Sequence, residues 1–98
     1  MRFASGASGT VLNGRLAPGA SQRFLLNARD GQMLEVQLSP RGPALEYQIF
    51  NPDGSFLLEQ IDAERPYRGQ LWQSGDHVVE VINRNQSTAG YRLSLRIE

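Results

Sequence analysis

His77 and Ser74 are the two residues of this chain whose types come nearest to a hydrolytic pair. His77 is the only histidine among 98 residues, and Ser74 precedes it by three positions. Acyl transfer needs a nucleophile, a base and a third group that orients the base. Both residues fall on one tight Ser-Gly-Asp turn, which does not give two such side chains a relay geometry. We therefore predict that His77 packs at the edge of the core, at the end of a strand, and that the chain is not an enzyme.

The acidic residues form neither a catalytic pair nor a metal site that the sequence identifies. Glycoside cleavage needs two carboxylates at a defined separation, and we expect Glu59, Asp62 and Glu64 on a solvated loop. Zinc sites of the ordinary kinds need more than the one histidine of this cysteine-free chain. Calcium needs several converging oxygens, and the spacing of Asp53, Asp62 and Glu64 matches no calcium-binding loop. We expect no metal ion and no cofactor.

Aromatic and arginine side chains point instead to protein recognition, because they contribute most of the binding energy in protein interfaces. We expect Arg65, Arg68 and Arg84 to be exposed, and a guanidinium group can hold a partner's carboxylate through two hydrogen bonds. Core packing is the simpler interpretation of Trp72 and Tyr67. Tyr67, Arg68 and Arg84 are nevertheless candidate partner-binding residues, since they lie close in sequence to the Ser-Gly-Asp turn.

The composition is that of one globular domain covering residues 1–98. Hydrophobic residues make up 40% of the chain and charged residues 20%, and the net charge is zero. All ten basic residues are arginines, and ten acidic residues balance them. Phosphate binding needs a net or strongly clustered positive field, so this balance argues against nucleic acid as the main partner. No run approaches the roughly 20 apolar residues that a membrane helix needs.

Seven or eight short segments alternate apolar and polar residues with a period of two, which is the pattern of half-buried β-strands. In one of them, Leu34, Val36 and Leu38 point to one side and the residues between them to the other. Glycine, proline, asparagine or aspartate separates the segments. The predicted strands are residues 10–16, 23–28, 32–39, 45–50, 55–60, 70–72, 77–82 and 91–97.

The predicted fold is an all-β, antiparallel β-sandwich that resembles a jelly roll and has seven to eight short strands. The one-sided alternation gives each sheet a wet face and a dry face, and the dry faces should meet in one core. We expect Leu71 and Trp72 to anchor that core beside the Ser-Gly-Asp turn. Two segments should interrupt the strands. Residues 40–43 contain two prolines that end a strand, and residues 61–68 are polar and irregular, with room for a turn of helix.

A series of turn and core motifs runs through nearly the whole chain. It begins with Gly-x-Leu at 14–16 and Phe-x-Leu-x-Ala-x-x-Gly-Gln at 24–32, followed by Asn-Pro-Asp-Gly at 51–54. Gly-Gln-Leu-x-x-Ser-Gly with a later valine occupies 69–81, and Tyr-x-Leu-x-Leu-x-Ile closes the chain at 91–97. This series resembles the bacterial pre-peptidase C-terminal domain, a small jelly-roll sandwich. It is also similar to the periplasmic inhibitors of g-type lysozyme, which are stand-alone relatives of that fold.

The resemblance to the inhibitors implies a partner and a contact site. Inhibitors of this group carry a Ser-Gly turn followed by a tyrosine near their contact surface. Ser74 and Gly75 match that turn, whereas His77 replaces the tyrosine. The resemblance therefore implies that Ser74, Gly75, Asp76 and His77 contact a lysozyme, without a cofactor. The rigid turn, or an arginine near it, would fill the cleft of the lysozyme and bind its catalytic carboxylates.

The resemblance also implies a periplasmic or secreted location. Residues 3–9 are polar and rich in glycine, as they would be if a start methionine preceded a processed sequence, so we expect that a signal peptide has been removed. Two alternatives remain beside the inhibitor. One is an accessory domain of a secreted bacterial enzyme, and the other is a carbohydrate-binding sandwich stabilised by calcium.

Overall fold

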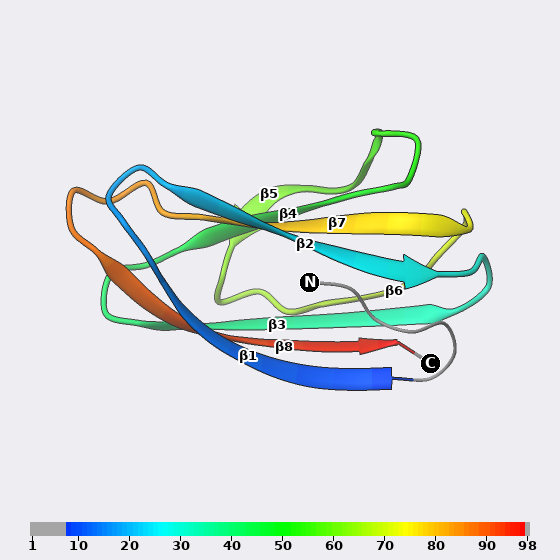
Figure 1. The fold of residues 1–98 in the computed structure, drawn as a ribbon, viewed down its shortest axis with the longest axis horizontal. Helices are drawn as coiled ribbons and strands as arrows, with labels where there is room; N and C mark the ends of the chain where they lie inside the picture. Colours follow the sequence, from blue (N-terminus) through cyan, green and yellow to red (C-terminus); the bar gives the residue numbers. More distant parts are fainter. Residues whose placement is uncertain (1–7, 98) are drawn as a thin grey trace.

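The computed structural model describes residues 8–97, which fold into eight β-strands (Figure 1). Residues 1–7 of the glycine-rich start lie outside this range. Most strands show the alternation that the sequence predicts, although the strand at 56–62 does not. Most of them begin or end within two residues of the predicted bounds. The strands are β1 (Ser8–Leu16), β2 (Ser21–Ala28), β3 (Met33–Arg41), β4 (Glu46–Phe50), β5 (Phe56–Asp62), β6 (Tyr67–Gln70), β7 (Gly75–Ile82) and β8 (Ala89–Ile97).

Two four-stranded sheets pack face to face as a sandwich (Figure 1). The first sheet has the strand order β1-β8-β3-β6, and the second sheet has the order β2-β7-β4-β5. Every strand pair is antiparallel. The chain crosses from one sheet to the other at every connection except the β4–β5 hairpin, which is the winding of a jelly roll. The predicted antiparallel, jelly-roll-like sandwich is confirmed.

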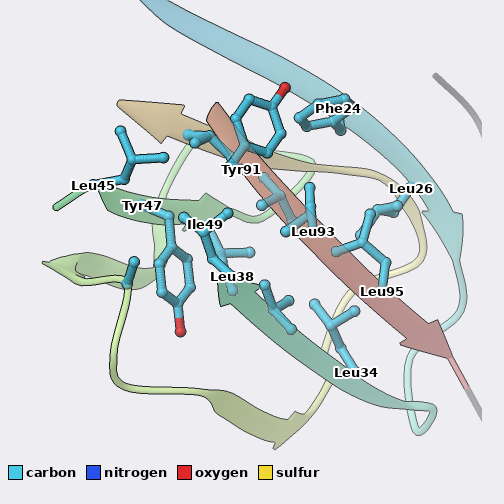
Figure 2. Close-up of a cluster of buried hydrophobic side chains, with 14 of the residues drawn as sticks. Phe24, Leu26, Leu34, Leu38, Leu45, Tyr47, Ile49, Tyr91, Leu93 and Leu95 are labelled. Carbon is cyan, nitrogen blue, oxygen red and sulfur yellow. The ribbon is translucent and has the colours of Figure 1, made fainter. Parts of the chain in front are cut away.

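The inner faces of the two sheets form one hydrophobic core, as the period of two predicts. Leu34, Val36 and Leu38 of β3 are each at most 2% exposed. Figure 2 shows residues of both sheets gathered in this core, among them Leu93 of β8 and Ile49 of β4. Full burial of a leucine or isoleucine side chain contributes about 1.5–3 kcal/mol, so these rows hold the two sheets together.

β3 continues through Pro40, although the sequence predicts that the strand ends before it. Pro40 pairs with Tyr91 of β8, whereas β6 pairs only with Met33–Val36. Beyond the β6 pairing, β3 therefore has a free edge, where a residue without an N–H group is tolerated. The predicted strand end is wrong, and β3 ends instead at Arg41, next to Gly42 with a φ of 123°.

Residues 61–68 contain a tight turn between two strands and no turn of helix. β5 extends to Asp62, and β6 begins at Tyr67. Between them, the N–H of Arg65 donates to the carbonyl of Asp62 at 3.1 Å. The Tyr47 hydroxyl donates to the carbonyl of Arg65, and burial raises the pKa of Tyr47 to about 12. The prediction of a helical turn is wrong, because this connection closes over the buried end of Tyr47.

Leu71 and Trp72 point in opposite directions beside the β6–β7 turn. The backbone of Leu71 accepts a hydrogen bond from the N–H of Gly31 and donates one to the carbonyl of Gln32, both at 2.7 Å. The Leu71 side chain is fully buried, whereas Trp72 is 72% exposed. Successive side chains of an extended chain point to opposite sides, so burial of Leu71 turns Trp72 outward. The predicted core position is confirmed for Leu71 and wrong for Trp72.

The end of the sandwich away from Trp72 is closed by a buried amide. The side chain of Asn83 donates through Nδ2 to the carbonyls of Leu16 at 3.0 Å, Ala17 at 3.1 Å and Ser87 at 3.0 Å. Asn83 is fully buried, so water does not compete for these bonds. They connect the β1–β2 turn to the β7–β8 loop. We call this end of the sandwich the base, and it consists of residues 17–20, 42–45 and 83–88.

Candidate partner-binding site

Three turns that are far apart in the sequence meet at the end of the sandwich opposite the base (Figure 1). They connect β2 to β3, β4 to β5, and β6 to β7. Their sequences are Arg-Asp-Gly, Asn-Pro-Asp-Gly and Ser-Gly-Asp, which are strong turn formers. All three were predicted as turns, and the sandwich brings them together. We call this end the tip, and it consists of residues 29–31, 51–55 and 72–76.

Polar side chains connect the three turns of the tip. The N–H of Asp30 donates to Ser74 Oγ at 3.1 Å, and the Ser74 hydroxyl donates back to Asp30 Oδ1 at 3.2 Å. Gln73 Nε2 donates to Asp53 Oδ2 at 3.0 Å. Hydrogen bonds from Ser55, and then from Gln73, lower the pKa of Asp53, so its carboxylate is charged at neutral pH. The Ser74 hydroxyl thus uses its hydrogen within the tip, and Ser74 holds the turns in place.

Gly75 fits the tip because it has no side chain. Its φ of 134° is one that other L-residues rarely adopt. A Cβ atom at this position would lie 3.1 Å from Cβ and 3.2 Å from Cγ of Pro52 in the neighbouring turn. The next residue, Asp76, accepts a hydrogen bond from Asn27 Nδ2 at 3.0 Å. Gly75 and Asp76 are both half-buried, and their contacts fix one turn against another.

Trp72 is the aromatic side chain of the tip, and Phe56, next to the tip at the start of β5, is also exposed. Trp72 is 72% exposed, and it is the only tryptophan of the chain. Arg29 of the β2–β3 turn is exposed too, and its side chain forms no ion pair within residues 8–97. The sequence predictions missed Trp72 and Arg29. The sequence contains one indication that Trp72 is exposed. Trp72 directly follows Leu71 in an extended segment, so the two side chains must point to opposite sides.

His77 does not reach the surface of the tip. It is fully buried on β7, opposite Leu26 of β2, and within residues 8–97 neither of its ring nitrogens has a hydrogen-bond partner of normal geometry. Burial lowers the pKa of His77, against the opposing influence of the Gly75 and Leu26 carbonyls and the Asp76 carboxylate, so the ring is neutral at pH 7. His77 is therefore a core residue rather than an edge residue. Its side chain is enclosed by the core, and the partner contact that the resemblance implies for it stays a prediction.

The other predicted partner-binding residues lie away from the tip. Arg84 belongs to the base, beyond the far end of β7, and its Nη1 lies 3.7 Å from Glu46 Oε1. Arg68 lies on β6, with its Nε 3.2 Å from Glu35 Oε1. Tyr67 is half-buried, and burial raises its pKa. The structure thus groups Ser74, Gly75 and Asp76 at the tip and separates Tyr67, Arg68 and Arg84 from them.

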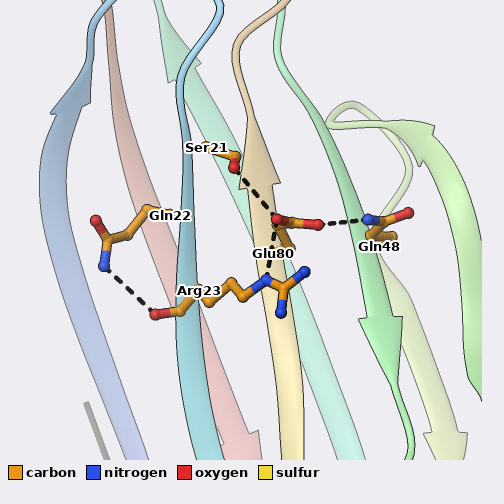
Figure 3. A network of polar contacts seen from close by, with 5 residues as sticks. All are labelled: Ser21, Gln22, Arg23, Gln48 and Glu80. Atoms are coloured by element: carbon orange, nitrogen blue, oxygen red, sulfur yellow. Dashed lines mark hydrogen bonds and ion pairs between the residues drawn. The ribbon is translucent and has the colours of Figure 1, made fainter. Parts of the chain in front are cut away.

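On the outer face of the second sheet, a network of polar side chains surrounds the carboxylate of Glu80 (Figure 3). Glu80 of β7 is 8% exposed and accepts hydrogen bonds from Ser21 Oγ and Arg23 Nε, both at 3.2 Å, and from Gln48 Nε2. Burial raises the pKa of Glu80, but the hydrogen bonds from Gln48, Arg23 and Ser21 outweigh it and lower the pKa overall. The carboxylate is charged and its oxygens are occupied, so it does not serve as an acid or a base.

The acidic residues considered as calcium ligands are not brought together. Asp53 lies in the turn before β5, and Asp62 is the last residue of that strand. In the part of the chain that the structure describes, no three histidine or acidic side chains are close enough to hold a metal ion. The same residues include no helix of the length and hydrophobicity needed to cross a membrane.

Known structures share this fold, although no family model and no curated protein matches the sequence. PliG, a periplasmic lysozyme inhibitor of g-type lysozyme, from Aeromonas hydrophila is 20% identical with a TM-score of 0.80, over 95% of this chain and 89% of the inhibitor. PliG from Salmonella Typhimurium is 19% identical with a TM-score of 0.71, over 100% and 96% of the two chains. The pre-peptidase C-terminal domain of a collagenase from Bacillus anthracis is 12% identical with a TM-score of 0.70, over 96% of this chain and 91% of that domain. The chain therefore has the fold of both families that its motifs resemble.

Proposed function

We propose that this chain is a non-enzymatic binding protein, periplasmic or secreted, that inserts its tip into the cleft of a lysozyme. The observation that carries the proposal is the 72% exposure of Trp72 on a tip whose turns are connected by hydrogen bonds. Aromatic anchors dominate the energetics of protein interfaces. A preorganised surface also loses little conformational entropy when it docks. The structural similarity to the PliG inhibitors supports a lysozyme as the partner.

The proposed mechanism is steric and electrostatic. Enzymes that cleave glycosidic bonds carry a pair of carboxylic residues in their cleft. Arg29 is exposed at the tip, and its guanidinium group can hold one of these carboxylates through two hydrogen bonds. The indole ring of Trp72 provides the apolar contact beside it. With the tip in this position, the polysaccharide substrate is excluded from the cleft without a covalent step or a cofactor.

Inhibition of cell-wall lysis by g-type, c-type and i-type lysozymes tests this function. We expect inhibition of the g-type enzyme, and Trp72→Ala and Arg29→Ala should each weaken it by at least about tenfold. Arg84→Ala removes the same charge from the base and should retain inhibition within about twofold of the original. The proposal is wrong if none of the three lysozymes is inhibited at micromolar protein. It is also wrong if the Arg84 and Arg29 variants lose inhibition equally.

The similarity to a collagenase pre-peptidase C-terminal domain supports a second candidate function. In that case the chain is an accessory domain that binds a substrate for a neighbouring catalytic domain. The native open reading frame separates the two candidates. A catalytic domain encoded in the same frame favours the accessory domain, and a signal peptide followed by this domain alone favours the inhibitor.

A further inference from the structure

The outer face of the first sheet carries half of the arginines of the chain. The register of β1, β8, β3 and β6 places outward-pointing residues of the four strands in rows across this face. Within residues 8–97, Glu35 is the only acidic residue among the outward-pointing positions of these strands. We call this surface the arginine face, and its arginines are Arg15, Arg41, Arg68, Arg92 and Arg96.

Ion pairing leaves most of the positive charge of the arginine face unneutralised. Arg68 is paired with Glu35, with 3.2 Å between Nε and Oε1. In the described part of the chain, Arg15, Arg41 and Arg92 form no ion pair with an acidic side chain. On the second sheet, by contrast, Arg23 is paired with Glu80, as Figure 3 shows. The zero net charge of the chain therefore conceals a strongly basic surface.

Three adjoining hollows follow β8 along the arginine face. The first, of about 610 Å³, lies between Arg15 and Arg41, which are in register with Gly90 on either side of it. The second, of about 270 Å³, is lined by Arg92. The third, of about 420 Å³, is lined by Arg96 and by the Arg68–Glu35 ion pair. Arg96 follows Gly90 by six positions of strand, so the three hollows extend over about 20 Å of β8. We call this row of hollows the groove.

The groove carries hydroxyl and amide groups between its arginines and no outward-facing aromatic ring. Tyr91 and Tyr67 line it, but both lie on the inner face of the sheet. Single-stranded nucleic acid is held by stacking of its bases on exposed aromatic rings, and the described residues that line the groove offer none. Val11 is the one exposed large hydrophobic residue among them, so the groove lacks the apolar core of a protein interface. The polar side chains that line the groove are Asn13, Gln37, Ser39, Thr88 and Ser94.

We propose that the arginine face binds an extended anionic polysaccharide. Guanidinium groups at Arg15, Arg41 and Arg92 pair with carboxylate or sulfate groups of the chain, each through two hydrogen bonds. The amides and hydroxyls between them bind sugar hydroxyl groups. Gly90 lies on β8, between β1 and β3, and has no side chain. It therefore leaves room for an extended polysaccharide in the groove. This site is separate from the tip and is additional to the proposed lysozyme inhibition.

Binding of dextran sulfate and of polygalacturonate, with neutral dextran as the control, tests the proposal. The double variant Arg15→Gln/Arg41→Gln should bind both anionic polymers at least about tenfold more weakly. The double variant Arg65→Gln/Arg84→Gln loses the same charge from exposed positions off the arginine face. It should bind within about twofold of the original protein. Equal loss in the two double variants, or no binding of either anionic polymer at low salt, overturns the proposal.

Gly90→Leu tests whether the ligand lies in the groove. A Cβ atom at this position would meet Arg41 Cβ and the Arg41 carbonyl at 3.6 Å, which is ordinary contact. The leucine side chain therefore fills the first hollow without a change of charge, and thermal unfolding checks that the fold is kept. If the variant binds the anionic polymers about fivefold more weakly or worse, the polysaccharide lies in the groove. Unchanged affinity means that only general attraction to the basic surface operates, and it overturns the proposal.

The nature of the polymer is tested by two competitors. Tighter binding of oligo(dT), or of vesicles containing phosphatidylglycerol, than of dextran sulfate would assign the arginine face to nucleic acid or to a membrane surface instead. Binding of neutral dextran as tightly as of the anionic polymers would also overturn the proposal. Arg15→Gln/Arg41→Gln should inhibit lysozyme like the original protein, so this proposal and the proposed inhibition fail independently.

Discussion

The base and the tip of the sandwich are closed by different kinds of contact. At the base, Asn83 is fully buried and its Nδ2 reaches three carbonyls, while its Oδ1 accepts from Asn85 N at 3.0 Å and Nδ2 at 2.9 Å. At the tip, the connecting bonds run between exposed residues such as Ser74 and Asp30. Water competes for exposed hydrogen bonds, whereas a buried group that loses its partner costs about 1–3 kcal/mol.

This difference separates stability from recognition. The base is held together by the amide of Asn83, which water cannot reach. The tip holds its shape through weaker contacts and keeps the large indole of Trp72 in solvent. The exposed indole of Trp72 is the apolar surface on which the proposed partner contact rests.

Removal of the buried amide at the base should have the largest effect. Asn83→Ala removes the side-chain donor to the carbonyls of Leu16, Ala17 and Ser87, and the free energy of unfolding should fall by about 3 kcal/mol. Asn85→Ala is the comparison variant, because its amide donates from a more accessible position to Ala44 O at 2.6 Å. The Asn85 amide also donates to Asn83 Oδ1, but that oxygen keeps the Asn85 N–H as a donor in the variant. Asn85→Ala should cost about 1 kcal/mol. Urea denaturation measures both, and equal losses would show that burial of the amide is not what stabilises the base.

A side chain at Gly75 should have the next largest effect. Gly75→Ala combines a strained φ of 134° with close contact to Pro52, so it should destabilise the protein by about 2 kcal/mol. Gly54→Ala in the neighbouring turn has a positive φ of 89° but no atom within 4 Å of the new Cβ. It should cost about 1 kcal/mol. A Gly75 variant no less stable than the Gly54 variant would show that the Pro52 contact does not hold the tip.

The stability of the protein should decrease between pH 7 and pH 5 because of His77, which is buried beneath the tip. Burial lowers the pKa of His77 below its ordinary value of 6.5. As the pH falls below that value, the unfolded chain takes up a proton that the folded chain does not, so the unfolded state is favoured. The loss is at most about 1.4 kcal/mol per pH unit. His77→Leu should flatten this dependence in urea denaturation at pH 7, 6 and 5.

Glu80→Gln is the control for the pH dependence. The lowered pKa of Glu80 gives a contribution that is fully present above the ordinary value of 4.5 and is lost as the pH falls through the folded-state pKa. Its removal should therefore leave the slope between pH 7 and pH 5 unchanged. A slope that survives in the His77 variant but disappears in the Glu80 variant would assign the acid sensitivity to the Glu80 network.

Truncation of Trp72 should have the smallest effect on stability. Because its side chain is 72% exposed, Trp72→Ala should change the free energy of unfolding by less than about 0.5 kcal/mol. Trp72 is also the only tryptophan, so its fluorescence reports on the tip alone. Acrylamide should quench it readily in the free protein and poorly after a g-type lysozyme has bound. Strong protection from quenching in the free protein would contradict the exposure of the tip.

The sequence predicts the fold because the alternation of apolar residues is local information. Leu34, Val36 and Leu38 lie two residues apart, and a strand must then bury all three on one face. The turns are local too, since Pro52 and Gly54 favour a reversal in any context. For this reason the jelly-roll-like sandwich and most strands are predicted correctly. The end of β3 is missed because Pro40 is tolerated only where a neighbouring strand is absent.

The candidate site was predicted less well, because exposure depends on neighbours that are distant in the sequence. Ser74 was correctly expected in a turn, but its hydrogen bonds to Asp30 cross 44 positions of sequence. The burial of His77 depends on the sheet packed over β7. Whether Ser74, Gly75, Asp76, Tyr67, Arg68 or Arg84 contacts a partner remains a prediction, which the inhibition assay and its variants address.

The sequence by itself determines a two-sheet β domain, since a period of two and well-placed turn formers allow few other folds. Only the tertiary structure decides which charges and aromatic groups share a surface. Zero net charge is a sum over the chain, and it contains no information on the register that aligns Arg15 and Arg41 on either side of Gly90. In the same way, Trp72 is left in solvent because the strands bury Leu71 beside it. Long-range pairing fixes both outcomes, and local sequence does not encode it.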